Sequence, residues 1–358
     1  MRRFATGVIA SLAFCCATTH GAPASAQSGA VAAMERLGIT LPATVSENAA
    51  VRAPLDELAR EACDRQAIAS LGAALRKTGY RRQGAVALVK FSDLCKGDPP
   101  SLRTAINILL DLSDYAETVR VATELIKLEP LGDNGFFLRA VGHERGGDFK
   151  KAIDDYATAL ELFPNKQTIS SIGYTGLARS HEKLGQFCDA ALAIEAWVAA
   201  NPTRNDTANA QAMIAGNVSK GKCASGDKMD DVFPVSRQGN VVMIDVTVNG
   251  SKGRFILDTG ATWVSMTRSF AGKAKVDIEE DSTMKLHTAN GITDGKRGKA
   301  KLIQLKTVKA SDVPLVVQAD AKGTYGPGID GLLGMSFLSR FNVTIAKDHI
   351  RIASRASR

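Results

Sequence analysis

A helical pattern that recurs about every 34 residues is the strongest constraint on how this 358-residue chain folds. Four segments rich in alanine and leucine at helical spacing align on Tyr80, Tyr115, Phe149 and Phe187. Tyr115 and Phe149 are 34 residues apart, and the neighbouring intervals are 35 and 38 residues. One helical pair cannot bury its apolar face alone, so a repeat of this length predicts helical pairs that stack into a solenoid.

The repeats resemble those of the tetratricopeptide family. In the third copy, Ala152, Tyr156 and Ala159 supply the small, aromatic and small residues of that family's second helix, and Pro164 ends the helix because its ring cannot continue the hydrogen-bond ladder. The resemblance covers residues 55–225 and implies a concave groove that holds a peptide substrate or a protein partner. A stabilising spacer is the alternative. The aligned aromatic residues are expected to pack between helices.

The first 26 residues have the features of a secretory signal peptide. Arg2 and Arg3 precede a mostly apolar stretch, and Ala24-Ser25-Ala26 supplies small residues for cleavage after Ala26. We therefore expect a periplasmic or secreted protein. No later segment has the roughly 20 apolar residues that a membrane span needs. Lipidation at Cys15 is a weaker alternative, because bulky Phe14 stands where a small residue is wanted. Residues 27–54 are expected to form a linker or irregular segment.

Charge argues against a nucleic-acid partner. Lys and Arg number 45 against 37 Asp and Glu, a formal net charge of +8, and no basic run with interleaved aromatics occurs. A dedicated nucleic-acid surface normally shows such a run. The excess fits solubility or loose attraction to anionic surfaces.

Four cysteines follow the predicted leader, an even number that predicts disulfides in an oxidising compartment. The repeat register places Cys63 at the start of a first helix and Cys95 at the end of its partner, and these ends coincide in an antiparallel pair. Cys188 begins the second helix of the fourth repeat, and Cys223 follows a helix that runs back towards that beginning. We predict the pairs Cys63 with Cys95 and Cys188 with Cys223.

From residue 229 onward, short runs of alternating apolar residues separated by turn residues predict a β domain that spans residues 229–358. Val242, Val246 and Val248 belong to an alternating apolar strand, and Asn249-Gly250 is a strong hairpin turn signal. The following run, Arg254-Phe255-Ile256-Leu257, resumes as a strand. The predicted hairpin therefore delivers Asp258 at a strand end.

Three segments of this part resemble retroviral-type aspartic peptidases. Asp258-Thr259-Gly260-Ala261 resembles their active-site loop, Leu286-His287-Thr288-Ala289-Asn290-Gly291 their flap hairpin, and Ile329-Asp330-Gly331-Leu332-Leu333-Gly334 the apolar element beneath the loop. The resemblance extends to a short helix at residues 335–338 and a closing hairpin at residues 341–352. It implies an all-β acid-protease fold behind the all-α solenoid.

The resemblance also implies roles for named residues. Asp258 is expected to be the catalytic carboxylate, with Thr259 bonding to a partner loop and Gly260 donating its amide to Asp258. Ala261 and the flap residues Thr288, Ala289, Asn290 and Gly291 are expected to contact substrate. Water activation needs two carboxylates about 3 Å apart that share one proton, and no metal or cofactor is expected.

Only one Asp-Thr-Gly occurs in the chain, so the second carboxylate is expected from a second copy in a homodimer formed through this domain. Asp330 is the intramolecular alternative. Ala261 cannot donate the hydrogen bond that a serine would, which favours activity at mildly acid to neutral pH. The predicted function is exported aspartic endopeptidase. A non-catalytic peptide-binding or scaffold protein is the competing hypothesis, separated from it by an Asp258→Ala cleavage assay.

Overall fold

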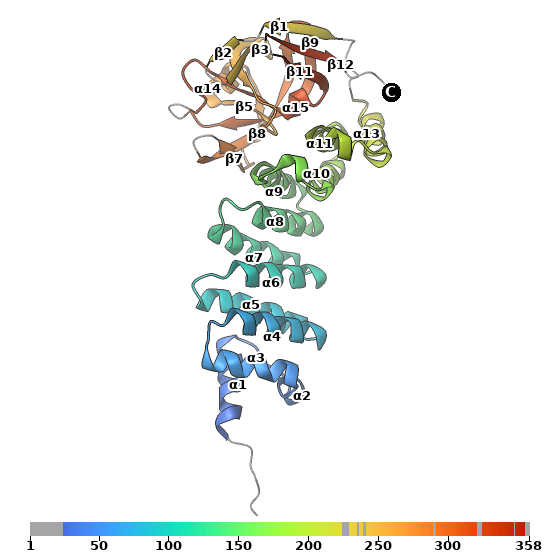
Figure 1. The fold of residues 1–358 in the computed structure, drawn as a ribbon. Coiled ribbons are helices and arrows are strands. Elements are labelled where there is room, and N and C mark those ends of the chain that lie inside the picture. Colours follow the sequence, from blue (N-terminus) through green and yellow to red (C-terminus); the bar gives the residue numbers. More distant parts are fainter. Residues whose placement is uncertain are drawn as a thin grey trace, which may run out of the picture. The chain divides into compact units, whose positions relative to one another are not determined.

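The structure, a computed structural model, describes residues 24–223, 229–234, 236–238, 241–288, 291–320, 324–346 and 348–354. The predicted signal peptide lies outside the described residues except for its last three, which begin the first helix. The chain divides into two compact units, Met1–Phe91 and Ser92–Arg358, and the ribbon is drawn in Figure 1. The boundary between helices and strands falls within the second unit.

Helices build the first unit, including the segment expected to be a linker. They are α1 (Ala24–Arg36), α2 (Ala43–Ser46), α3 (Ala49–Arg60), α4 (Arg65–Lys77) and most of α5 (Arg81–Leu94). The prediction of an irregular segment at residues 27–54 was therefore wrong. The physical reason is tertiary packing: Val51, Leu55 and Leu58 are fully buried on one face of α3, which packs against α1 and α4. Short helices gain most of their stability from such contacts.

Paired helices continue through the second unit. They are α6 (Pro99–Asp111), α7 (Tyr115–Leu128), α8 (Asp133–Gly146), α9 (Phe149–Leu162), α10 (Ser171–Lys183), α11 (Phe187–Ala200), α12 (Pro202–Asn205) and α13 (Ala208–Gly221). Each of α6 to α11 packs against the next. Asp114 and Asp148 cap the second helices of two repeats by accepting hydrogen bonds from Glu117 N and Lys151 N, which satisfies amides that the helix leaves unpaired.

The aromatic residues that revealed the repeat lie where the second helices of the repeats begin and are half-buried. Tyr156 is a fully buried aromatic residue of the repeat core, and its hydroxyl donates to Glu144 at 2.5 Å. Cys188 and Cys223 form a disulfide, as predicted. Cys63 and Cys95 are also disulfide-bonded, and their pairing with each other stays a prediction.

Strands begin at Asp230 and form two sheets. The smaller has the order β1-β12-β11, from β1 (Asp230–Pro234), β11 (Phe341–Ile345) and β12 (His349–Ser354). The larger has the order β2-β3-β4-β10-β5-β9-β8-β6, with β7 paired to β8. Its strands are β2 (Ser236–Gln238), β3 (Val241–Val248), β4 (Ser251–Leu257), β5 (Val264–Thr267), β6 (Asp277–Ile278), β7 (Met284–Thr288), β8 (Gly291–Leu305), β9 (Val308–Gln318) and β10 (Gly331–Leu333).

Two short helices, α14 (Arg268–Lys273) and α15 (Met335–Leu338), complete the β part. The helix at 335–338 and the closing hairpin β11–β12 lie where the sequence predicted them. One core joins both sheets through fully buried residues such as Val248, Phe255 and Phe337.

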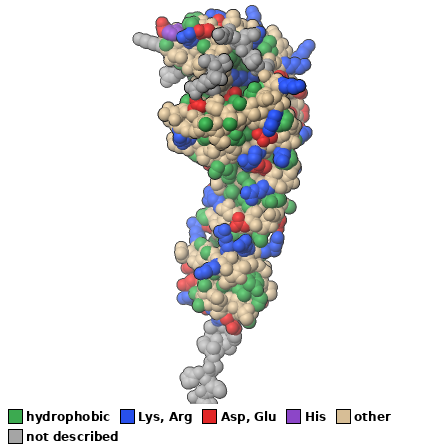
Figure 2. Space-filling model, turned by 90° about the vertical axis from the view of Figure 1, so that its right-hand side faces the viewer, with side chains coloured by type: hydrophobic (Ala, Val, Ile, Leu, Met, Phe, Trp, Pro, Cys, Tyr) green, Lys and Arg blue, Asp and Glu red, His purple; other side chains and the backbone are tan. Residues whose placement is uncertain are grey.

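No helix in the described ranges is long and apolar enough to cross a membrane. Lys and Arg side chains are dispersed over the face shown in Figure 2 among acidic, apolar and other groups. This dispersal accords with a modest charge excess.

Candidate active site

Asp258 stands at the end of β4, where the chain leaves the sheet. Its amide donates to Leu333 O at 3.2 Å, which fixes the start of the loop against β10. Its Oδ1 accepts a hydrogen bond from Gly260 N at 2.9 Å. A Cβ on Gly260 would lie 3.2 Å from that same oxygen, so glycine permits this close turn. The side chain of Asp258 is half-buried, while Thr259 and Gly260 are exposed.

The loop rests on β10, which is inserted between β4 and β5. β10 runs parallel to β4, with Leu333 opposite Leu257, and antiparallel to β5. Glycine is required at both ends of β10. A Cβ on Gly331 would lie 2.1 Å from Ser265 O, and one on Gly334 would lie 2.2 Å from Trp263 O. The apolar element therefore lies under the active-site loop because two glycines allow the backbones to touch.

Asp330 lies too far from Asp258 to share a proton with it. Its Oδ2 accepts from Arg254 N at 2.9 Å, and its own amide donates to Arg254 O at 2.8 Å. Asp330 therefore lies beside Arg254, which precedes Asp258 by four residues. A strand rises about 3.3 Å per residue, so Arg254 and Asp258 are about 13 Å apart along β4. Carboxylates that far apart cannot share a proton.

The predicted flap is a hairpin of β7 and β8. These strands pair antiparallel from Met284 opposite Gly295 to Thr288 opposite Gly291. Thr288 Oγ1 donates to Gly291 O at 2.7 Å, and Gly291 has a φ of +106°, which favours glycine. His287 occupies an ordinary strand position. Ala289 and Asn290, the other two predicted substrate contacts, lie outside the described residues.

A groove of about 560 Å³ borders the active-site loop. Thr259 and Gly260 line it from the loop, Phe341 and Val343 from β11, and Ala199 from α11. None of the described residues that line it is acidic. Within the described part of one chain, the groove therefore supplies no partner carboxylate for Asp258.

Helix α9 of the repeats packs against β7, the first strand of the flap. Thr158 Oγ1 on α9 accepts a hydrogen bond from Lys285 N at 3.1 Å. Beside it, Ala157 shares a buried cluster with Met284 and Leu286. This contact was not predicted, because both partners carry residues that are ordinary for their own helix or strand.

Two ion pairs connect β8, the second strand of the flap hairpin, to the repeats. Arg297 on β8 binds Asp154 on α9, and both side chains are 13% exposed. Lys299 Nζ lies 2.7 Å from Asp189 Oδ2 on α11. Burial raises the pKa of Asp154 from 3.8 to about 6, although Arg297 acts in the opposite direction. The contact therefore contains an acid that titrates in a physiological range.

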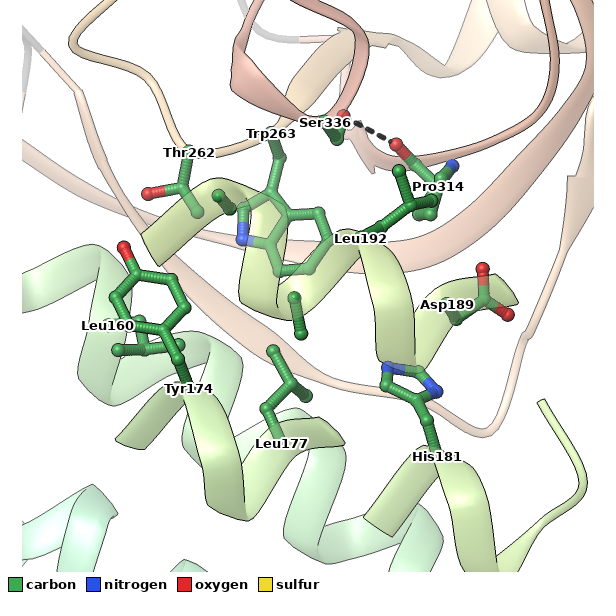
Figure 3. Close-up of a pocket in the computed structure, with 12 residues that line it drawn as sticks. Leu160, Tyr174, Leu177, His181, Asp189, Leu192, Thr262, Trp263, Pro314 and Ser336 are labelled. Carbon is green, nitrogen blue, oxygen red and sulfur yellow. Dashed lines mark hydrogen bonds between the residues drawn. The ribbon is translucent and has the colours of Figure 1, made fainter. Parts of the chain in front are cut away.

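Trp263 joins the loop to the repeat core. Figure 3 shows its indole between the segments that carry Pro314 and Ser336 and the helices that carry Leu177 and Leu192. These side chains line a small cavity of about 30 Å³. The packing of Trp263 against the repeats was not predicted from the sequence.

Comparisons with known proteins agree with the resemblance. Residues 244–340 match the family described as "gag-polyprotein putative aspartyl protease", and this stretch contains the loop, the flap and the element beneath the loop. No curated protein matches the chain. The β part is thus a retropepsin-like aspartyl protease domain, and helical repeats of the tetratricopeptide type precede it.

Solved structures align with each part separately. A retropepsin-like aspartic protease from Rickettsia conorii aligns at 23% identity over 37% of this chain and 96% of its own, with a TM-score of 0.29. The retroviral protease-like domain of Ddi1 from Leishmania major aligns at 15% identity over 31% and 82%, with a TM-score of 0.22. MamA from Desulfovibrio magneticus RS-1 aligns at 15% identity over 51% and 97%, with a TM-score of 0.37.

Proposed function

We propose that this protein is an exported aspartic endopeptidase whose active site is completed by two copies of the chain, each contributing Asp258. The observation that carries the proposal is the carboxylate of Asp258, held by the Gly260 amide at the end of β4. A fixed, half-buried carboxylate beside an open groove is the group that activates water in this chemistry.

The reaction follows from a shared proton. One Asp258 takes a proton from water as the water oxygen attacks the peptide carbonyl carbon, and the partner's Asp258 gives its proton to the carbonyl oxygen. The tetrahedral intermediate then collapses: one of its two hydroxyl groups returns a proton to the ionised Asp258, the C–N bond breaks, and the leaving nitrogen takes the proton of the other Asp258, so that the dyad again holds one proton. Thr259 is proposed to bond across to the other loop.

A second copy is proposed because no acidic residue lines the groove beside the loop within the described part of one chain. Asp330, the obvious candidate, is committed to the Arg254 amide. Two-fold symmetry brings the same loop from both subunits to one axis and supplies the missing carboxylate.

The proposed substrate is an extended protein segment lying between the dyad and the flap. Ala261, Thr288, Ala289, Asn290 and Gly291 are proposed to contact it, as a strand-like ligand pairs with a hairpin. The repeats are proposed to recruit substrate or a partner. Disulfides at all four cysteines outside the leader are consistent with an oxidising compartment, which supports export to the periplasm or beyond.

Cleavage of casein or a peptide library by the purified mature chain tests the proposal. Asp258→Ala and Asp258→Asn should abolish cleavage. Asp245→Asn should not, because Asp245 is an exposed aspartate on the neighbouring strand. Cleavage that survives in both Asp258 variants would remove the mechanism, and absence of cleavage in wild type would favour the non-catalytic peptide-binding protein.

Dilution tests the shared site. Specific activity should fall as the chain is diluted below the dimer dissociation constant, and excess Asp258→Asn chains should suppress wild-type activity by forming mixed dimers. A monomer in sedimentation that keeps full specific activity would contradict a site made by two copies.

A further inference from the structure

We propose that Trp263 is a positioning residue, through which the repeat helices α10 and α11 hold the active-site loop and the base of the flap in place. The inference deepens the proposed peptidase function and rests on it for its kinetic consequence. Its structural consequence can be measured without any activity.

Trp263 belongs to two apolar clusters at once. It packs against the repeat core, which includes Leu177 of α10 and Ile194 of α11. It also packs against the cluster of Ala157, Met284, Leu286 and Val316, which contains two residues of the flap strand β7. One side chain therefore touches both the repeats and the flap base. An aromatic of this size contributes a large share of the apolar contact at such a junction.

The backbone around Trp263 is fixed as firmly as its side chain. Thr262 O accepts from Ser336 N at 3.0 Å, and Val264 N donates to Ser336 Oγ at 2.9 Å. The Ser336 hydroxyl in turn donates to Pro314 O at 2.7 Å, the bond drawn in Figure 3. Only four residues separate this anchored position from Asp258. Displacement of the indole is therefore transmitted to the loop through a short, tightly bonded segment.

Trp263 positions the loop through apolar packing and not through a hydrogen bond. The indole Nε1 is buried and has no hydrogen-bond partner within the part of the chain that the structure describes. A phenylalanine would keep an aromatic ring for the apolar contact and would lose the smaller ring of the indole together with its unpaired N–H group. An alanine would remove the contact itself and leave the repeats and the loop without their shared side chain.

The experiment compares wild type with Trp263→Ala and Trp263→Phe by hydrogen exchange and by steady-state kinetics, below the melting temperature of each. Trp263→Ala should increase exchange in residues 257–262 and 284–288 and lower kcat roughly 100-fold with a smaller change in KM, because misplaced reacting groups cost about that much. Trp263→Phe should lie much closer to wild type than Trp263→Ala in both measurements, because it keeps an aromatic ring in the same packing.

Leu192→Ala supplies a second route if Trp263→Ala does not fold. Leu192 is a half-buried residue of α11 that lines the same cavity but lies outside the loop. The Leu192→Ala variant should also increase hydrogen exchange in residues 257–262 and 284–288. Unchanged exchange there in folded Trp263→Ala or Leu192→Ala, or a Trp263→Phe variant as impaired as Trp263→Ala, would overturn the positioning role. Absence of cleavage in wild type with the predicted exchange pattern would instead refute only the peptidase function.

Discussion

Ionisation of Asp154 should make the second unit less stable as the pH rises from about 4 to 6. Burial between α9 and β8 raises the pKa of its carboxyl group to about 6, against 3.8 for the ordinary group. The folded state therefore binds this proton more tightly than the unfolded state does. Wherever the folded state holds more protons, stability falls with rising pH, and the fall ends once both states are ionised.

The magnitude follows from the two pKa values. Their difference is about 2 units, and each unit corresponds to 1.36 kcal/mol, so the effect approaches 3 kcal/mol. Little of it is lost to solvent screening, since the Asp154 side chain is 13% exposed. Replacement by asparagine removes the titration and keeps an oxygen that accepts from Arg297.

Tryptophan fluorescence isolates the relevant unit. Both tryptophans of the chain, Trp197 and Trp263, lie in Ser92–Arg358, so denaturant unfolding followed by their emission reports that unit. The unfolding free energy of wild type minus that of Asp154→Asn should fall by about 2 kcal/mol between pH 4 and pH 7, since part of the full effect lies below pH 4. Taking this difference cancels the titration of other groups.

A second carboxylate on the same helix provides a control with the opposite sign. Burial acts to raise the pKa of Asp148, but its hydrogen bonds from Lys151 outweigh this and lower it. Wild type minus Asp148→Asn should therefore rise as the pH increases through the acid range. A difference for Asp154→Asn that does not change with pH would refute the buried-acid reasoning.

Three further outcomes are expected. Gly334→Ala should destabilise the second unit by about 3 kcal/mol, because the added Cβ would lie 2.2 Å from a backbone oxygen. A Cβ added at Gly272 has no atom within 4 Å, so Gly272→Ala should be neutral in the same fluorescence assay. Replacing Cys188 and Cys223 together by serine should lower the unfolding free energy by about 4 kcal/mol, since the bond spans a sequence separation of 35; an unchanged denaturant midpoint would contradict this. Asp330→Asn should keep peptidase activity and cost about 1 kcal/mol, because the amide oxygen still accepts; loss of cleavage by a folded variant would reinstate it as a catalytic acid.

Local pattern was enough to predict most of the elements. The period of the aromatic residues indicated stacked helices, and the Asn249-Gly250 turn with its flanking strands placed Asp258 at a strand end. The repeat and the turn depend on residues close in sequence, whose backbone preferences and spacing carry the information. The flap hairpin, the short helix and the closing hairpin were instead expected from the resemblance to retroviral-type aspartic peptidases.

Helices in residues 27–54 were missed because local pattern is weak there. The segment contains short helices, and its stability comes from packing of α3 against α1 and α4. Tertiary contact decides the conformation of such segments, since a short helix is marginal by itself.

Periodicity and resemblance thus predicted a helical repeat and a retropepsin-like domain, with Asp258 as the candidate catalytic residue. The junction between the two at the site is seen only in the folded chain: Trp263 packs into the repeat core, and Asp154 binds Arg297 across 143 residues of sequence. Periodicity reports which face of an element is apolar, but which distant surface covers that face is set by shape and charge complementarity in the folded chain.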